Sequence, residues 1–453
     1  MEFLASAETL FGFYGSLKGL GVATASGLML LMLLGLLVTG MPLAFVTLLV
    51  ALFFALGWFG PMAVPLITSR IFSFVGSYVF VAVPMFVLMA SILDRSGIAR
   101  DLFDVMKLIG GRLRGALAVQ TLLVAVMLAA MSGIIGGEIV LLGLLALPQM
   151  LRLGYDRSLA IGVVCAGGAL GTMVPPSIVL IIYGLTANVS ISDLFTAAFT
   201  PGFMLAAFYA VYILTRAYLN PALAPIMGEG DVPDMSAGRL FVGLALPAVV
   251  IVIVLGSIYG GIASVTEASG LGVVGVVLST LVRGELTVRL IRDAALQTLS
   301  TCGMIVWIGI GASALIGVYN LMGGNRFVEA TLIGVSENPT VILLLMMAIL
   351  LVLGLFLDWV GIALLTMPIF VPIITTLGYD PIWFGVLFAM NMQVSFLSPP
   401  FGPAAFYLKS VAPPEISLAD IFKALLPFIG IQILALALLI AFPEIALWWR
   451  EDG

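Results

Sequence analysis

Two short segments of the sequence combine oxygen-bearing side chains with residues that interrupt a helix. The first, residues 167–177, ends in Val-Pro-Pro-Ser, and the second, residues 391–400, ends in Leu-Ser-Pro-Pro. A Pro-Pro pair removes two backbone donors and disfavours the helical conformation at the preceding residue. Carbonyls near the break lose their partners, and carbonyl and hydroxyl oxygens suit a hard cation such as Na⁺. Both segments are therefore candidate cation sites, and the alternative is a kink that serves packing alone.

Each break is preceded by an apolar hairpin whose turn carries small or acidic residues. The first turn, residues 132–137, reads SGIIGG and is followed by Glu138, whereas the second turn contains Asp358. Burying a carboxylate in a bilayer costs ~3 kcal/mol, and residues 327–408 contain neither Lys nor Arg. We therefore expect a bound cation, rather than an ion pair, beside Asp358. The glycines of the first turn are also explained by a tight turn, and Glu138 either binds a cation or proton or caps the returning helix.

These arguments define two predicted cation sites. Site 1 comprises Ser132, Gly133, Gly136, Gly137, Gly171, Thr172 and Pro175. Site 2 comprises Asp358, Gly361, Asn391, Ser395, Ser398 and Pro399. Glu138 and Ser177 are predicted contacts of a substrate or an ion. Na⁺ is the only metal expected, no other cofactor is expected, and no residue is predicted to be catalytic.

The composition places these sites in a membrane protein. Of the 453 residues, 62% are hydrophobic and 9% are charged, whereas soluble proteins carry about 25% charged residues. Apolar runs of about 20 residues, the length that spans a bilayer, recur along the whole chain. The lack of histidine excludes a His-ligated metal and a Ser-His-Asp triad, and it argues against a membrane-embedded enzyme. The net charge of −5 comes without the basic patch that nucleic acid requires.

An internal repeat organises the chain. Gly154-Tyr155-Asp156 recurs as Gly378-Tyr379-Asp380, and Pro175-Pro176 recurs as Pro399-Pro400, both at an offset of 224 residues. After a small insertion, residues 192–195 (SDLF) are matched by residues 419–422 (ADIF). The spacing predicts two related halves joined by a polar segment at 221–238.

Charge indicates how the two halves are oriented. Residues 95–114 hold five Lys and Arg residues, whereas the equivalent residues 319–338 hold only Arg326. Because Lys and Arg concentrate in cytoplasmic loops, this reversal predicts opposite orientations. Inverted repeats with interrupted helices are typical of secondary transporters. We therefore expect an all-α membrane protein with two inverted-topology repeats, each of about five spanning helices, one re-entrant hairpin and one broken helix.

The predicted boundaries follow the motifs. We expect an N-terminal extension at 1–21, a first repeat at 22–220, a linker at 221–238 and a second repeat at 239–453. In the first repeat the hairpin covers 113–152 and the broken helix covers 158–187. In the second repeat they cover 339–376 and 381–410.

Two further predictions concern single residues. Glu267 lies near the start of an apolar span and is expected to cap that helix. Tryptophan concentrates at membrane interfaces, so we expect interfacial anchors at Trp58, Trp359, Trp383, Trp448 and Trp449.

Over essentially its whole length after about residue 22, the chain resembles a known family. The strongest match runs through the motifs at 154–156 (GYD), 167–168 (GG), 174–177 (VPPS), 181–184 (IIYG) and 190–195 (SISDLF). A second signature covers 261–263 (GIA) and 266–268 (TEA). The family is the large membrane (M) subunit of TRAP transporters, the tripartite ATP-independent periplasmic transporters. The chain departs from it at Ser264-Val265, where a Thr-Pro pair is usual, and at Ile134-Ile135, where hydroxyl-bearing residues are common.

The resemblance implies an elevator-type transporter fold, in which the hairpins and broken helices slide against the remaining helices. It implies Na⁺ coupling, a small membrane (Q) subunit, a periplasmic substrate-binding (P) protein and an organic acid substrate, such as a dicarboxylate, keto acid or sugar acid. It also implies the bacterial inner membrane, with the linker in the cytoplasm and the C-terminus in the periplasm. The alternative is a self-sufficient sodium- or proton-coupled dicarboxylate transporter that needs no binding protein.

Overall fold

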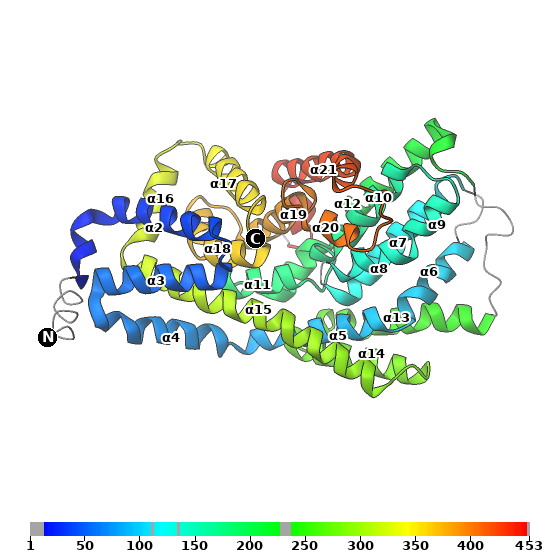
Figure 1. Ribbon diagram of the computed structural model, residues 1–453, viewed down its shortest axis with the longest axis horizontal. Coiled ribbons are helices and arrows are strands. Elements are labelled where there is room, and N and C mark those ends of the chain that lie inside the picture. The colour runs from blue at the N-terminus through cyan, green and yellow to red at the C-terminus, as the bar shows by residue number, and fades with distance from the viewer. Residues whose placement is uncertain (1–12, 110–112, 134–135, 227–236, 451–453) are drawn as a thin grey trace.

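The protein is helical throughout the part of the chain that is described. The computed structural model describes residues 13–109, 113–133, 136–226 and 237–450, and every element in them is a helix (Figure 1). The prediction of an all-α protein is therefore confirmed. In chain order the elements are η1 (Ser16–Leu20), α2 (Gly21–Val38), α3 (Leu43–Phe59), η2 (Gly60–Met62), α4 (Ala63–Val75), η3 (Tyr78–Val81), α5 (Ala82–Arg95), α6 (Ile98–Ile109), α7 (Ala116–Ser132), α8 (Gly137–Leu145), α9 (Leu147–Arg152), α10 (Arg157–Ala169), η4 (Leu170–Thr172), α11 (Ile178–Ala187), α12 (Ile191–Leu219), η5 (Pro221–Leu223), α13 (Ala237–Tyr259), α14 (Val265–Val282), α15 (Val288–Leu321), α16 (Gly324–Ile333), α17 (Pro339–Gly354), α18 (Trp359–Thr376), α19 (Pro381–Leu397), α20 (Pro403–Lys409), α21 (Leu418–Ala441) and α22 (Glu444–Leu447).

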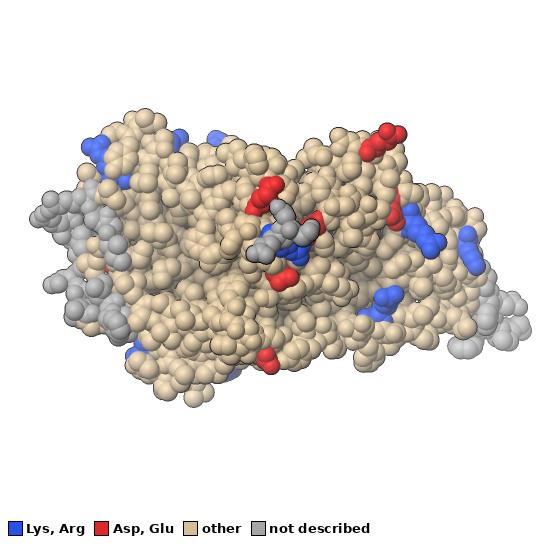
Figure 2. Space-filling model, turned by 180° about the vertical axis from the view of Figure 1, so that it is seen from behind, with Lys and Arg blue, Asp and Glu red and all other residues tan. Residues whose placement is uncertain are grey.

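The outer surface is apolar over wide areas. Within the described residues, eight helices are long and apolar enough to cross a bilayer. Large hydrophobic side chains point outward from them, and Leu31, Phe72 and Val38 are 67%, 72% and 88% exposed. Charged side chains are sparse on the face shown in Figure 2. Such a surface is stable only in lipid, which makes this a multi-pass membrane protein.

The helices form two groups (Figure 1). The scaffold group contains α3, α4, α5, α13, α14 and α15, and the 34-residue α15 contacts α3, α4 and α5 along its length. The hairpin group contains α7–α12 and α17–α21, and within it α10 and α19 both pack on α21. The groups touch where α5 contacts α7 and α8, and where α15 contacts α18.

The repeated Gly-Tyr-Asp motif builds the same local structure twice. Gly154 and Gly378 have φ angles of 80° and 83°, a left-handed conformation that ends the preceding helix at low steric cost. Asp156 and Asp380 then cap α10 and α19, because each carboxylate accepts a backbone N–H in the first turn. The motif therefore marks the passage from each hairpin into the helix that will be broken.

Three spanning helices begin with a serine cap. Ser190, Ser264 and Ser417 each accept the backbone N–H three residues later, at the starts of α12, α14 and α21. At α14 the Glu267 carboxylate also accepts the N–H of Ser264 at 2.8 Å. This capping box confirms the predicted role of Glu267, and such caps typically contribute ~1 kcal/mol.

Both Pro-Pro pairs lie between helices. The first pair separates η4 from α11, the second separates α19 from α20, and the peptide bond within each pair is cis. Pro175 and Pro176 are buried, whereas Pro399 and Pro400 are exposed. The first break is therefore enclosed by the hairpin group, and the second reaches the molecular surface.

Some predicted boundaries cannot be compared with the fold. Residues 1–12 of the N-terminal extension and 227–236 of the linker lie outside the described residues, as do Ile134 and Ile135 of the first hairpin turn. The described parts of the two hairpins are α7 to α9 and α17 to α18.

The prediction of interfacial tryptophans is wrong for two residues. Trp58 and Trp383 are only 8% and 1% exposed. The indole Nε1 of Trp383 donates a hydrogen bond of 2.9 Å to the carbonyl of Leu439. With its polar group satisfied inside the protein, this side chain no longer needs the membrane interface.

Candidate functional site

A cavity of about 570 Å³ lies where the turns of both hairpins meet the scaffold group. The first turn contributes Gly133, Gly136 and Gly137, and the second contributes residues 358–360. The remaining wall comes from α5 and α15 of the scaffold group, from α8 and α19, and from α11 and α20, which follow the two breaks. The volume lies within the range of small-molecule sites, about 300–1,000 Å³.

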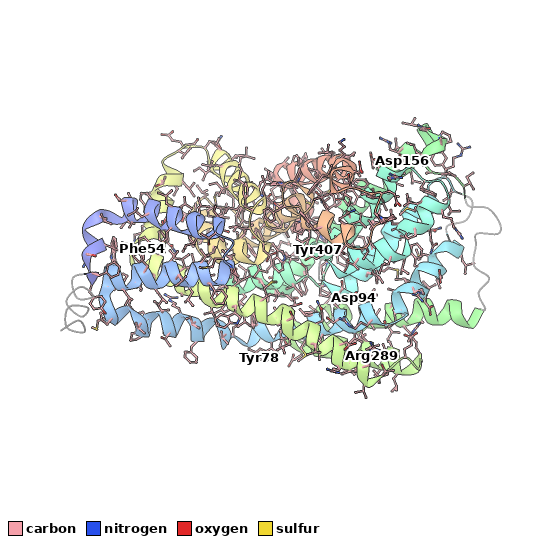
Figure 3. The ribbon with its side chains drawn as sticks, in the orientation of Figure 1. Phe54, Tyr78, Asp94, Asp156, Arg289 and Tyr407 are labelled. Carbon is pink, nitrogen blue, oxygen red and sulfur yellow. The ribbon has the colours of Figure 1, made fainter. Side chains whose placement is uncertain are left out.

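Polar groups of this cavity come from both helix groups. Among the described residues of its wall, the charged ones are Asp94, Arg95 and Asp358. Tyr407 of α20 joins them, and Figure 3 labels Tyr407 and Asp94, which come from different elements. An anionic ligand and a small cation therefore both find partners here.

In the first half, two predicted residues lie beside the buried carboxylate of a third. Glu138 is 1% exposed, and its Oε1 accepts a hydrogen bond from the Ser132 hydroxyl. Its Oε2 is buried and has no hydrogen-bond partner among the described residues. A Cβ at Gly171 would lie 3.2 Å from Oε1 and 3.4 Å from Oε2, so the carboxylate faces the backbone of η4. Ser132, Glu138 and Gly171 thus form one cluster, in which an acceptor oxygen is available to a cation.

The break beside this cluster is held by its own hydrogen bonds. The Ser177 hydroxyl donates to the Thr172 carbonyl at 2.6 Å, and the Thr172 hydroxyl donates to the Ala169 carbonyl at 3.1 Å. The Gly133 carbonyl accepts the N–H of Ile178 at 3.3 Å, which ties the hairpin turn to the start of α11. Pro175 is buried within the break.

The other two glycines of predicted site 1 face elsewhere. Gly136 lies against the ring of Tyr407, and Gly137 lies against the carboxylate of Asp94. A Cβ at Gly137 would clash with that carboxylate, so any other residue here would require the Asp94 side chain to move. The structure therefore brings Ser132, Gly171 and Glu138 together, whereas Gly136 and Gly137 line the larger cavity.

Two residues of predicted site 2 share a small pocket. Asp358 and Ser395 line a space of about 10 Å³ together with Gly354, which is roughly the room of one water-sized sphere. Asp358 caps α18 by accepting the N–H of Val360 at 3.2 Å. Asp358 is exposed to the cavity rather than buried, because the cavity runs along the second turn.

The other residues of predicted site 2 line neither of the two cavities that Asp358 lines. The amide of Asn391 donates to the carbonyl of Met347 at 2.8 Å, and its Oδ1 is buried without a partner among the described residues. The Ser398 hydroxyl donates to the Val394 carbonyl at 2.7 Å. Gly361 packs against Leu43 of α3, and Pro399 is exposed.

Sequence reasoning missed three residues of the cavity wall. Asp94 and Arg95 of the scaffold group and Tyr407 of the hairpin group line the cavity but belong to neither predicted site. Arg95 counted only as a marker of topology, because it begins the basic segment 95–114. The available signal was the Asp94-Arg95 pair at the end of an apolar span, since charges next to hydrocarbon are often functional.

Comparison with known proteins agrees with this architecture. A family model described as "Tripartite ATP-independent periplasmic transporter, DctM component" matches residues 30–445. The chain is 33% identical over 377 residues to the ectoine TRAP transporter large permease protein TeaC of Halomonas elongata, covering 82% of this chain and 86% of that protein. It is 28% identical over 453 residues to the C4-dicarboxylate TRAP transporter large permease protein DctM of Vibrio cholerae, covering 94% and 97%. The sialic acid TRAP transporter large permease protein SiaM of Vibrio cholerae is also 28% identical, over 422 residues, covering 92% and 96%.

A solved structure shares the fold. The Alcanivorax borkumensis YdaH transporter matches with a TM-score of 0.60 at 14% identity, covering 84% of this chain and 88% of that one. The family match spans nearly all of the chain, and the permeases it resembles are transporters rather than enzymes. The chain therefore belongs to the DctM family, the large membrane permease subunits of tripartite ATP-independent periplasmic transporters.

Proposed function

We propose that this chain is the transmembrane subunit of a sodium-coupled transporter that imports an organic acid delivered by a periplasmic binding protein. The cavity between the two hairpin turns carries the proposal, because its wall combines residues of both helix groups. A ligand in this position contacts the hairpin group and the scaffold group at once. Sliding of one group against the other then changes which side of the membrane the ligand can reach.

The two carboxylates at the turns support sodium coupling. A buried, unpartnered carboxylate oxygen such as Glu138 Oε2 is costly without a counter-charge. A sodium ion held by Glu138 with nearby backbone carbonyls supplies that charge, and a second ion fits between Asp358 and Ser395. With both ions bound, the cavity attracts an anion more strongly.

The family match supports the proposed partners, and the charge bias of the sequence supports the proposed orientation. We assign a small membrane (Q) subunit and a periplasmic substrate-binding (P) protein as partners. The linker at 221–238 lies in the cytoplasm and the C-terminus in the periplasm, and the two halves have inverted topology. The names of related permeases include a C4-dicarboxylate, sialic acid, ectoine and isethionate, so the proposal is limited to an organic acid.

Reconstituted vesicles test this function. The chain is inserted with its small subunit, the binding protein is added outside, and uptake of radiolabelled succinate, sialic acid, ectoine and isethionate is measured. We expect uptake of at least one compound only with an inward Na⁺ gradient and all three components. A sodium ionophore that collapses the gradient serves as the control.

The other outcomes separate the alternatives. Uptake by this chain alone supports the self-sufficient transporter instead. Uptake that follows a proton gradient in sodium-free buffer contradicts sodium coupling. If the complete system transports none of the four compounds, the proposal fails for these substrate classes.

A further inference from the structure

A second cavity adjoins the one between the hairpin turns. This outer cavity has a volume of about 600 Å³ and extends past the end of α5 to α6, α8 and the start of α15. Asp94, Arg95 and Leu141 line both cavities. Figure 3 labels Asp94 and Arg289, which lie in the wall of the outer cavity on α5 and α15. The two spaces therefore meet at the last turn of α5.

Three arginines line the outer cavity, and acids lie near all three. The Nε of Arg289 is 3.7 Å from Oδ2 of Asp293. Arg100 faces Glu285, whose pKa it helps to lower. Arg95 is the third, and among the described residues of the inner wall it is the only base. An anion that leaves the inner cavity by this route must pass Arg95.

The guanidinium of Arg95 has unused hydrogen-bonding capacity. Its Nη1 donates to the carbonyl of Ser91 at 3.0 Å, and no other hydrogen bond to Arg95 exists within the described residues. A guanidinium carries five N–H donors in a planar fork that matches a carboxylate. The side chain is exposed and lines both cavities, so its remaining donors are available to a ligand.

A purely structural role explains less of this arrangement. An arginine at the C-terminus of a helix interacts favourably with its last carbonyls and with its dipole, and the bond to Ser91 does this. That role requires neither an exposed guanidinium nor a place in two cavities. The neighbouring Asp94 partly offsets the positive charge, which suits a site that must bind an anion and also release it.

We propose that Arg95 binds a carboxylate of the transported acid at this junction and passes the acid to the outer cavity, which acts as a release vestibule. The basic segment 95–114 favours the cytoplasmic side for this vestibule. The inference rests on the proposed function and adds to it a residue and a route. The ligand class is an organic carboxylate.

Variants of Arg95 test the route in the complete vesicle system. With succinate as the probe, Arg95→Gln should lower net uptake and raise the KM for efflux from the vestibule side, each about tenfold. Arg95→Lys should recover part of both, because it restores the charge without the fork. Arg289→Gln is the matched control, since it removes a base from the outer cavity alone, and it should stay within about twofold of the wild type. Sialic acid is used if the wild type does not carry succinate.

A measurement on the wild-type protein covers the case in which the variants fold poorly. Phenylglyoxal modifies exposed arginines, and mass spectrometry follows each one separately. Saturating succinate should slow modification of Arg95 at least threefold and leave Arg289 unchanged. Equal protection of both, or none, overturns the proposal, as does wild-type transport by Arg95→Gln. Failure of the wild-type complex to transport any organic acid contradicts the proposed function itself.

Discussion

Each hairpin turn carries one carboxylate, and the two carboxylates have opposite surroundings. Glu138 is buried and bonded to Ser132, whereas Asp358 is exposed to the cavity and caps α18. Glu138 therefore depends on a bound cation or proton for compensation, while Asp358 can remain hydrated when no ion is present. We expect the two ions to bind with different affinities.

Removal of the Asp358 carboxylate tests the second ion site. Asp358→Ala should reduce sodium-dependent uptake at least tenfold, because Ser395 alone offers no charge to the ion. The substitution also removes the cap of α18, which costs ~1 kcal/mol. Membrane insertion, measured by the amount of protein in washed membranes, should be unchanged.

A second variant separates charge from capping. Asn is as good a helix cap as Asp, so Asp358→Asn keeps the start of α18 and loses only the negative charge. Ser398→Ala is the matched control, because the Ser398 hydroxyl bonds to Val394 and lies outside the small pocket. If Asp358→Asn keeps the sodium dependence of the wild type, the second ion site is wrong.

At this scale the sequence could identify types of residue but not their neighbours. Asn391 and Ser395 are assigned to one site because both lie in the segment that ends at the second Pro-Pro pair. The amide of Asn391 instead bonds to Met347 of α17. That contact joins residues distant in the chain, and the same is true of Gly361 on Leu43 and of Arg95 at the cavity. Local spacing contains no information about such contacts.

At the scale of elements, an ion-pair cluster joins α6 to the loop between α14 and α15. Arg283 lies 2.6 Å from Asp101 of α6 and 2.8 Å from Glu285. Glu285 also accepts the N–H of Gly97 at 2.8 Å, in the link between α5 and α6. The cluster fixes the start of α6, the helix that leads from the scaffold group into the first hairpin.

This cluster predicts a pH dependence of stability. The Arg283 guanidinium, with help from the Gly97 N–H, holds the pKa of Glu285 below its ordinary value of 4.5. A lowered pKa in the folded state means that Glu285 stabilises the fold above pH 4.5 and loses this effect as the pH falls below it. The difference in melting temperature between the wild type and Glu285→Gln should therefore be largest near pH 7 and shrink towards pH 3.5.

Melting curves in detergent at half-unit pH steps provide this measurement. Asp293→Asn serves as the control, because its partner Arg289 is almost fully exposed and the pair contributes little. A difference that stays constant across the range would show that Glu285 acts through packing alone.

The starts of helices were the elements most accessible to prediction. The cap by Glu267 is predicted from the sequence and is present in the structure. Asp156, Asp380 and Ser264 also cap helices and are equally local signals, although that role is not predicted for them from the sequence. The burial of Trp383 was not accessible in this way, because it depends on a carbonyl of α21 that receives its indole N–H.

At the scale of the whole molecule, the inverted topology is still a prediction. It rests on the reversed charge bias between residues 95–114 and 319–338. Single cysteines at Lys107 and Thr331, in a background without the two native cysteines, should react with a membrane-impermeant maleimide from opposite sides. Labelling of both from the same side would refute the inversion.

The division into two groups could only partly be foreseen. The motifs predicted the positions of both hairpins and both breaks, because each of these features depends on residues that are close together in the sequence. The side of each hairpin that faces α5 or α15 depends on packing between distant segments of the chain. Ser91 of α5, Gln297 of α15 and Tyr407 of α20 line one cavity although each lies more than 100 residues from the next. The cavity therefore emerged only from the fold.

The contact of Gly137 with the Asp94 carboxylate has a consequence for the history of the family. A Cβ at position 137 would clash with Oδ2 of Asp94, so a larger residue there requires the Asp94 side chain to move. The two positions should therefore have evolved together, and a relative with a larger residue at 137 should carry a shorter one at 94. A survey of relatives would show whether the residues at these two positions vary together, and so whether the close packing of the hairpin against α5 has been maintained.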